Sequence, residues 1–326
     1  MYVGIDIGGT KCAVCFGQAA GISDINIVDR TAFPTPKDTG YPAVLARMCE
    51  IIASHGSREQ IEAIGISCGG PLDTKAGRIL SPPNLPGWDE VEITAFFSSR
   101  FHVPVALQND ANAGALAEWR YGAARGLQHV IFLTFGTGFG AGLILDGRLY
   151  EGASGMAGEA GHIRLSEYGP VGFGKAGSFE GFCSGGGLAE LGRMKALEAL
   201  QAGKSPAYCT SHALLSSITA KDIARAAKAG DETAGMVFDL CARKLGLGLA
   251  MLMDLINPQM IVLGSIFYRC QDLLYDTAMS VIRQEALPRS REACQVVPCA
   301  LGESLGDYAA LAVACMAAEK EEQKHG

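Results

Sequence analysis

The sequence has few charged residues and no excess of basic ones. Among 326 residues, 27 lysines and arginines stand against 34 aspartates and glutamates, so the formal net charge at pH 7 is −7. This balance argues against a surface that follows phosphates by charge, and we expect no nucleic acid partner. Hydrophobic residues make up 48% of the chain and charged residues 19%, which excludes disorder for the chain as a whole.

A membrane-length hydrophobic run is also lacking. The longest apolar-rich stretch, 130–145, is shorter than the ~18 residues of a membrane span, and four glycines interrupt it. We see no charged, cleavable leader, since the chain opens with the strand-like pattern Tyr2-Val3-Gly4-Ile5. We therefore expect a soluble, cytoplasmic protein without a membrane partner.

Cysteines at metal or redox spacing are scarce. The eleven cysteines are odd in number and scattered, and most lie in apolar runs, so we expect reduced core residues. Only Cys12 and Cys15 form a C-x-x-C pair. A redox or metal pair is the less favoured interpretation, because both residues lie in the strand-like run 12–16.

Glycine, in contrast, is abundant: 42 of the 326 residues, without a collagen period, indicate many tight turns and close approaches to a ligand. The length suggests about two domains at ~150 residues each, and the apolar periodicity predicts a mixed α/β fold with two lobes. Strands are expected at 2–7, 12–16, 61–67, 103–107, 130–134, 142–145 and 260–263. Helices are expected at 41–54, 111–121, 188–200, 219–228, 231–256, 272–286 and 307–318, followed by a frayed tail at 319–326.

The first two expected strands enclose a Gly-Gly turn that follows an acid, in the segment Gly4-Ile5-Asp6-Ile7-Gly8-Gly9-Thr10-Lys11. Glycines let backbone N–H groups approach phosphate oxygens, Thr10 adds a hydroxyl donor, and Asp6 is placed to hold magnesium through water. An ordinary hairpin turn is the alternative interpretation.

A second glycine turn, Gly136-Thr137-Gly138-Phe139-Gly140-Ala141, repeats this chemistry. It matches the dinucleotide pattern G-x-G-x-x-A, but that pattern requires a helix next, and here a strand at 142–145 follows. The motif GxxxxGK[ST] is missing as well, which excludes a P-loop. Two such turns, one in each lobe, would hold a nucleoside triphosphate from both sides of a cleft.

In their order and spacing, the motifs of this chain resemble the ROK family of sugar kinases and repressors, within the actin-like ATPase superfamily. The motifs that carry the resemblance are Gly4–Lys11, Gly70-Pro71-Leu72-Asp73, 81–88, Asn109-Asp110-Ala111-Asn112-Ala113, 136–142 and Gly158-Glu159-Ala160-Gly161-His162. The resemblance implies a two-lobed actin-like (ribonuclease H-like) fold with a nucleotide and sugar cleft between the lobes. The smaller lobe would comprise residues 1–115 plus 305–326, and the larger lobe residues 116–304.

The resemblance also assigns functional residues. It makes Asp110 the base that takes the proton of the sugar hydroxyl, whereas sequence chemistry alone favours an N-cap of the following helix at this position. The implied sugar-binding residues are Asn84, Asn109, Asp110, Glu159, His162 and Glu180. The implied nucleotide-side residues are Asp6, Gly8, Gly9, Thr10, Lys11, Gly136, Thr137, Gly138 and Gly264.

The chain departs from the family at two places. Many members hold a structural zinc with the histidine that matches His162 and three cysteines, but Val171, Phe173 and Ser178 occupy the cysteine positions here. One histidine cannot complete a tetrahedral site, so we predict no zinc and expect Val171 and Phe173 to replace the metal by apolar packing. Near the nucleoside, Gly264-Ser265 stands where relatives carry a run of glycines, which predicts a bulkier wall.

The resemblance implies a kinase that uses ATP and Mg²⁺ to phosphorylate a hexose at its terminal hydroxymethyl oxygen. Glucose is the best single candidate, while fructose, mannose, allose and N-acyl-hexosamines stay open. The alternatives are a catalytically silent sugar-binding protein and a sugar-responsive repressor. Such repressors carry a helix-turn-helix domain before the first glycine turn, whereas here the turn begins at Gly4. The apolar helix expected at 231–256 offers a surface for a possible homodimer.

Overall fold

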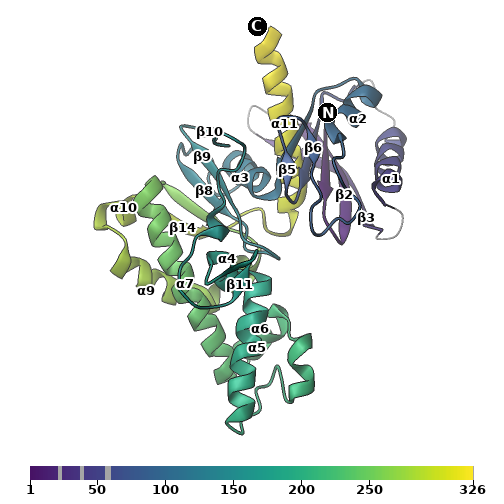
Figure 1. The fold of residues 1–326 in the computed structure, drawn as a ribbon. Helices are drawn as coiled ribbons and strands as arrows, with labels where there is room; N and C mark the ends of the chain where they lie inside the picture. Colours follow the sequence, from purple (N-terminus) through teal and green to yellow (C-terminus); the bar gives the residue numbers. More distant parts are fainter. Residues whose placement is uncertain (21–23, 37–39, 56–59, 326) are drawn as a thin grey trace. The chain divides into compact units, whose positions relative to one another are not determined.

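The computed structural model describes residues 1–20, 24–36, 40–55 and 60–325 (Figure 1). The chain forms two compact units, which are treated separately below. Unit 1 comprises Met1–Leu127, Gly142–Ala157 and Ala300–Gly326, and unit 2 comprises Gln128–Ala141 and Gly158–Cys299. The predicted lobes, 1–115 plus 305–326 and 116–304, stay a prediction.

Unit 1 is built on a five-stranded sheet with the order β3-β2-β1-β4-β7. The pairs β1–β2 and β2–β3 are antiparallel, and β1–β4 and β4–β7 are parallel. All six residues of β4 are buried, as expected for a strand that is covered on both faces. The strands are β1 (Tyr2–Ile7), β2 (Lys11–Ala19), β3 (Ile25–Pro34), β4 (Ala63–Cys68) and β7 (Val105–Asn109).

Helix α11 (Leu305–His325) packs against β1 and β4 of this sheet. A Cβ at Gly65 would lie 2.1 Å from the backbone nitrogen of Ala314, so the helix reaches the strand only because this residue is glycine. The other elements of unit 1 are α1 (Gly40–Ser54), β5 (Leu72–Asp73), β6 (Arg78–Ile79), α2 (Ile93–Phe101), α3 (Asp110–Tyr121), the part of β9 (Ala141–Leu145) from Gly142 on, β10 (Arg148–Leu149) and the 3₁₀ turn η4 (Gly302–Ser304).

Unit 2 combines parallel strands with a helical layer. Strand β13 (Met260–Leu263) pairs in parallel with both β8 (Val130–Leu133) and β14 (Gln295–Pro298). The longest helix packs closely on α9, because Gly246 leaves room for the carbonyl of Ala278. The helices are α4 (Phe179–Phe182), α5 (Gly185–Gln201), α6 (Ala220–Lys228), α7 (Glu232–Ile256), α8 (Ile266–Arg269), α9 (Gln271–Glu285) and α10 (Pro288–Ala293), with 3₁₀ turns η2 (Ala160–His162) and η3 (His212–Ser217) and the hairpin β11 (Val171–Gly172) and β12 (Lys175–Ala176).

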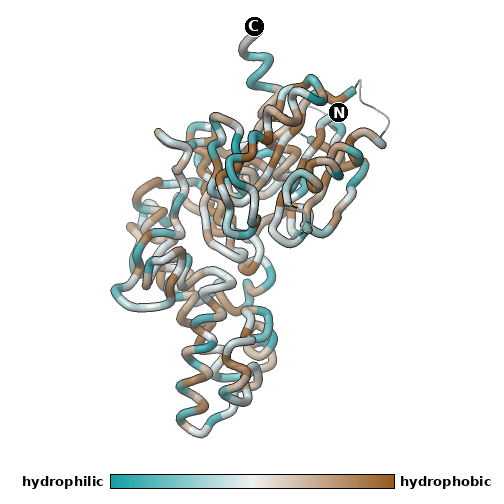
Figure 2. The backbone as a smooth tube through the Cα atoms, turned by 45° about the vertical axis from the view of Figure 1, so that its right-hand side comes forward, coloured by the Kyte–Doolittle hydropathy of each residue, from teal (hydrophilic) through white to brown (hydrophobic). Residues whose placement is uncertain are grey.

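The C-terminal tail differs from its prediction. Residues 319–325 continue helix α11 instead of fraying, and Figure 2 shows this end of the helix as hydrophilic. Arg120 of α3 donates two hydrogen bonds to the carboxylate of Glu319, at 2.7 and 2.6 Å. A bidentate pair of this kind holds the polar end of α11 against α3.

The eleven cysteines are thiols outside any disulfide, and ten of them are buried, which confirms the prediction of reduced core residues. Cys12 Sγ lies 3.2 Å from Thr35 Oγ1, whereas Cys15 Sγ donates to the carbonyl of Gly4 at 3.5 Å. Being three residues apart in one strand, the two thiols point to opposite faces and do not form a redox pair. Among the residues that the structure describes, no helix is long and apolar enough to cross a membrane.

A buried carboxylate joins two distant segments of unit 1. Glu118 of α3 has an exposed fraction of 0%, yet its oxygens accept backbone hydrogen bonds from Ala123 at 2.8 Å, Ala300 at 3.2 Å and Leu301 at 3.0 Å. Three donors compensate the carboxylate for the lost water. Glu118 therefore anchors the end of α3 to the chain that enters α11.

We expect Glu118→Ala to lower the free energy of unfolding by at least about 3 kcal/mol, because it leaves three buried N–H groups without an acceptor. Urea unfolding of the variant measures this loss. The control is Glu319→Ala, which removes a half-exposed ion pair and should cost no more than about 1 kcal/mol. Equal effects of the two substitutions would contradict the anchoring role.

Candidate active site

The parallel strands of unit 1 bring several predicted site residues to one edge of the sheet. The register sets Ile7 opposite Cys68, and Cys68 opposite Asn109, so β1, β4 and β7 end side by side. The first glycine turn follows β1, and Asp110 follows β7. In open sheets of parallel strands, ligands bind at this carboxyl edge.

The first glycine turn is closed by one hydrogen bond within it and by two from Thr35. Gly8 N donates to the Lys11 carbonyl at 3.1 Å. Thr35 adds two bonds, from its hydroxyl to the Gly8 carbonyl at 2.6 Å and from its N–H to the Thr10 carbonyl at 3.0 Å. Thr10 and Lys11 themselves are exposed.

Asn84 lies directly against this turn. A Cβ at Gly9 would lie 2.6 Å from the carbonyl oxygen and 2.7 Å from the Cβ of Asn84. The loop that carries Asn84 is anchored by the buried side chains of Leu85 and Trp88, while Asn84 is exposed. The structure therefore brings a residue predicted for the sugar beside the turn predicted for phosphate.

Asp6 lies at the end of β1 under the start of α11. A Cβ at Gly306 would lie 2.9 Å from its Oδ2, and the adjacent Asp307 is paired with Arg30 at 2.7 Å. Burial, followed by the negative charges of Asp307 and Asp110, raises the pKa of Asp6 to about 6, against the opposing charges of Lys11 and Arg30. The carboxylate is therefore ionised at neutral pH only against an electrostatic penalty that a cation would relieve.

The described residues contain no group of three or more metal-ligating side chains. Mg²⁺ usually keeps several waters and binds one or two carboxylates together with substrate phosphates. Asp6, a single carboxylate close to the first glycine turn with a raised pKa, fits this arrangement.

Asn109 and Asp110 are adjacent at the start of α3, but only one of them caps the helix. Asn109 is the N-cap, since its side chain accepts from the N–H of Asn112 at 2.7 Å. The alternative interpretation of Asp110 as the cap is therefore wrong. Asp110 occupies the first helical turn with an exposed side chain.

The second glycine turn belongs to unit 2 and is closed by Thr134. Thr134 N donates to the Gly140 carbonyl at 2.9 Å, and Gly140 N donates back to Thr134 Oγ1 at 2.9 Å. Within the loop, Gly136 N donates to the Gly138 carbonyl at 3.1 Å, and Thr137 at its tip is exposed.

Glu180, predicted for the sugar, lies against this second turn. Its Oε2 accepts from the N–H of Phe139 at 3.0 Å, and a Cβ at Gly138 would lie 3.0 Å from the same oxygen. A Cβ at Gly161 would lie 2.0 Å from the Phe139 carbonyl and 3.3 Å from the Glu180 Cβ. The Gly158–His162 motif, Glu180 and the turn thus pack together, with Glu159 and His162 exposed.

The loop after His162 corrects one prediction. Val171 and Phe173 do not pack in place of a metal, because their side chains are 59% and 77% exposed. Backbone hydrogen bonds hold the loop instead, from Leu165 N to the Gly177 carbonyl at 2.8 Å and from Gly177 N to the Pro170 carbonyl at 2.9 Å. Ser178, the third replaced position, is fully buried and caps α4.

The turn after β13 lies beside the second glycine turn. Gly264 N donates to the Leu133 carbonyl at 3.0 Å, and Ile266 N to the Phe135 carbonyl at 2.7 Å. Ser265, between them, has φ 46° and ψ −103°, a conformation that side chains disfavour. The backbone of Ser265 is therefore strained, while the bulkier wall near the nucleoside stays a prediction.

The predicted residues thus fall into two sets. Unit 1 holds Asp6, Gly8, Gly9, Thr10, Lys11, Asn84, Asn109 and Asp110, and unit 2 holds Gly136, Thr137, Gly138, Glu159, His162, Glu180 and Gly264. That the two sets serve one ligand pair stays a prediction. Sequence reasoning missed Thr35 and Arg30, whose roles come from contacts with distant residues and leave no local motif.

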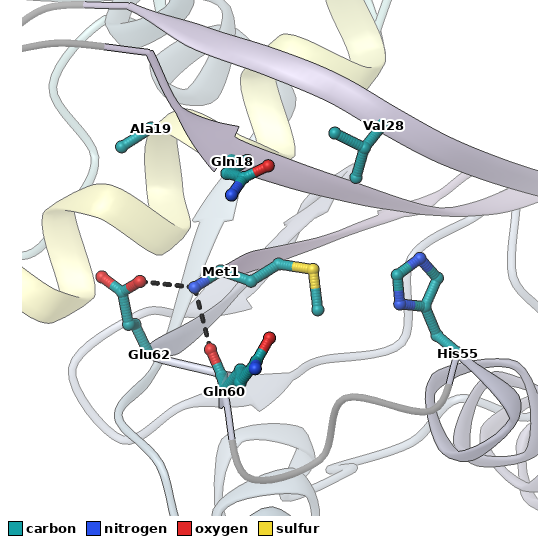
Figure 3. Close-up of a pocket in the computed structure, with 7 residues that line it drawn as sticks. All are labelled: Met1, Gln18, Ala19, Val28, His55, Gln60 and Glu62. Atoms are coloured by element: carbon teal, nitrogen blue, oxygen red, sulfur yellow. Dashed lines mark hydrogen bonds and ion pairs between the residues drawn. The ribbon is translucent and has the colours of Figure 1, made fainter.

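A pocket of unit 1 lies away from these residues. Figure 3 shows it at the start of β1, lined by Met1, Gln18, Ala19, Val28, His55, Gln60 and Glu62. The terminal ammonium of Met1 donates to the Gln60 carbonyl at 2.8 Å and to the Glu62 carboxylate. Because it lies at the amino ends of β1 and β4, this pocket is separate from the carboxyl edge of the sheet.

Comparison with known proteins identifies relatives along nearly the whole chain. The model of the ROK family matches residues 2–317. A glucokinase of Halalkalibacterium halodurans is 31% identical over 312 residues, which are 94% of this chain and 92% of the relative. A xylose repressor of Caldicellulosiruptor bescii is 34% identical over 227 residues, which are 69% of this chain and 55% of the repressor.

Solved structures are similar over the same length. The ROK hexokinase of Thermus thermophilus is 29% identical with a TM-score of 0.79, covering 100% of this chain and 99% of its own. A ROK family glucokinase from Streptomyces griseus, solved with glucose and AMPPNP, is 30% identical with a TM-score of 0.75, covering 97% and 99%. Such kinases have the two-lobed actin-like ATPase fold, so the predicted fold class is confirmed.

The raised pKa of Asp6 predicts a dependence of stability on pH. Because the folded protein holds this proton more tightly than the unfolded chain, the contribution is complete below pH ~4 and is lost as the pH rises through about 6. Asp6→Asn should remove this decline, which amounts to about 3 kcal/mol at most. Urea unfolding of both proteins between pH 4.5 and 7.5 measures the difference.

Asp73→Asn is the control of opposite sign. A backbone hydrogen bond from Ala76 lowers the pKa of Asp73, so this substitution should reduce stability at neutral pH instead of raising it. If the free energies of unfolding of the wild type and Asp6→Asn show the same dependence on pH, the pKa of Asp6 is not raised by folding.

Proposed function

The chain belongs to the ROK family, and on that premise we propose that it is an ATP-dependent kinase that phosphorylates a hexose at its terminal hydroxymethyl oxygen. Glucose is the proposed substrate, because the relatives named glucokinase match at about 30% identity over most of both chains. A cytoplasmic location belongs to the same proposal.

The observation that carries the proposal is the capping of α3 by Asn109. Since Asn109 supplies the capping oxygen, the carboxylate of Asp110 is not required for that role and stays exposed at the carboxyl edge of the sheet. The first glycine turn and Asn84 lie at the same edge within unit 1. A base, a phosphate turn and a polar sugar contact are the groups that phosphoryl transfer to a sugar needs.

In the proposed reaction, Asp110 accepts the proton of the sugar hydroxyl while the hydroxyl oxygen attacks the γ-phosphorus of ATP. The new O–P bond forms in line with the breaking bond to ADP, which departs with its electron pair. Asp6 would hold the Mg²⁺ that binds together with ATP, and this ion would supply positive charge against the phosphates. Thr10 and the backbone N–H groups of the glycine turns hold phosphate oxygens in place.

The proposed sugar contacts are Asn84, Asn109, Glu159, His162 and Glu180. Each sugar hydroxyl that leaves water needs a hydrogen-bonding partner, and a polyol therefore needs several convergent polar side chains. Glu180 would act on both ligands, since one of its oxygens already orients the second glycine turn.

A sugar-responsive regulator is the second candidate, favoured by the repressor relative at 34% identity. This chain spans only 55% of that repressor. ADP release in the presence of ATP, Mg²⁺ and a panel of hexoses separates the two functions. A kinase turns over with at least one hexose, whereas a regulator binds sugar without releasing ADP.

We expect Asp110→Asn to lower kcat by about 10²-fold or more on the best hexose, because a positioned base contributes typically ~10²–10⁴-fold. Binding of the sugar should remain within a few fold when measured by calorimetry. Asp272→Asn is the matched control, since it removes a carboxylate from the first turn of α9. If Asp110→Asn keeps more than about a tenth of the wild-type kcat, Asp110 is not the base.

A further inference from the structure

The helix that carries Asp110 is fixed by side chains on both sides of that residue. Gln108 and Asn112 stand two residues before and two residues after Asp110, and each is 1% exposed. The side-chain amide of Asn112 donates to Gln108 Oε1 at 3.1 Å. The backbone from 108 to 112 is therefore closed into a small ring by this bond and by the Asn109 cap.

The ring is held from outside by one carboxylate. Gln108 Nε2 donates to Glu151 Oε1 at 2.8 Å, and Thr74 Oγ1 donates to the same oxygen at 3.4 Å. Glu151 follows β10 in a loop of unit 1 and is half-buried. A hydrogen bond to an ionised acceptor is stronger than one between neutral groups, so Glu151 decides which way the Gln108 amide faces.

This orientation leaves one polar atom unsatisfied. Asn112 Oδ1 is buried and has no hydrogen-bond partner in the part of the chain that the structure describes. A buried acceptor without a partner is destabilising, and a half-satisfied polar network is worse for stability than an apolar core. The network is therefore better explained by the geometry it imposes on residues 108–112 than by stability.

We propose that Glu151 is a positioning residue for Asp110, acting through Gln108 and Asn112. The inference rests on the proposed function, because it assumes that Asp110 must meet a hydroxyl at hydrogen-bond distance. A misplacement of about 1 Å at a reacting group lowers the rate by up to ~10²-fold. Removing Glu151 frees the amide of Gln108 to rotate and loosens the ring around the base.

Glu151→Ala should lower kcat about tenfold or more while changing the KM for the sugar less than about threefold. Glu151→Gln keeps a carbonyl acceptor for Gln108 and should restore most of kcat. Glu167→Ala, at an exposed position in unit 2, is the matched control and should behave as the wild type. Circular dichroism and thermal unfolding of each variant show that the comparison concerns folded protein.

Hydrogen exchange gives a readout that does not need turnover. The backbone N–H of Asn112 should lose its protection from exchange in Glu151→Ala and regain it in Glu151→Gln. The backbone N–H groups in the strands of unit 1 should keep their protection in both variants. If the variants show this pattern but the wild type phosphorylates no hexose, the structural link from Glu151 to Asp110 is supported. Only the proposed function is then contradicted. The inference is overturned if Glu151→Ala changes neither kcat nor the protection of Asn112. It is also overturned if kcat and protection fall in Glu151→Ala and Glu151→Gln does not restore them.

Discussion

Helix α3 begins with two adjacent polar residues, and the oxygen of only one of them caps it. Because Asn109 accepts the N–H of Asn112, the neighbouring Asp110 keeps an exposed carboxylate at the carboxyl edge of the sheet. The parallel register of β1, β4 and β7 then brings the first glycine turn to the same edge. The proposed chemistry of unit 1 depends on this one capping bond.

The same edge concentrates negative charge, which is costly in an apo protein and useful to a kinase. Burial and the negative charges of Asp307 and Asp110 raise the pKa of Asp6, and Arg30 forms its ion pair with Asp307. A phosphate ligand brings its own cation, and a buried carboxylate with a raised pKa is poised to accept it. Within unit 2, Glu180 orients the backbone of the second glycine turn by accepting from the N–H of Phe139.

Buried strands and long amphipathic helices were predicted from the sequence, because burial on both faces produces continuous apolar runs such as Met260–Leu263. Strand β3 was missed, since most of its residues are exposed and its pairing with β2 sets its structure. The predicted packing of Val171 and Phe173 was also wrong, since both side chains are exposed. An apolar residue type does not reveal whether its hairpin faces a core or water. Local motifs revealed the glycine turns and Asp110, but Glu118 and Glu151 act through contacts across 182 and 43 residues.

The central claim is that Asp110 meets the hydroxyl that is phosphorylated. The most direct measurement is a crystal structure of Asp110→Asn with the preferred hexose and a non-hydrolysable ATP analogue. The side chain of residue 110 should lie about 2.6–3.2 Å from the terminal hydroxymethyl oxygen of the sugar. An ordered hexose whose hydroxymethyl oxygen contacts a different carboxylate, with residue 110 beyond hydrogen-bond reach, would contradict it.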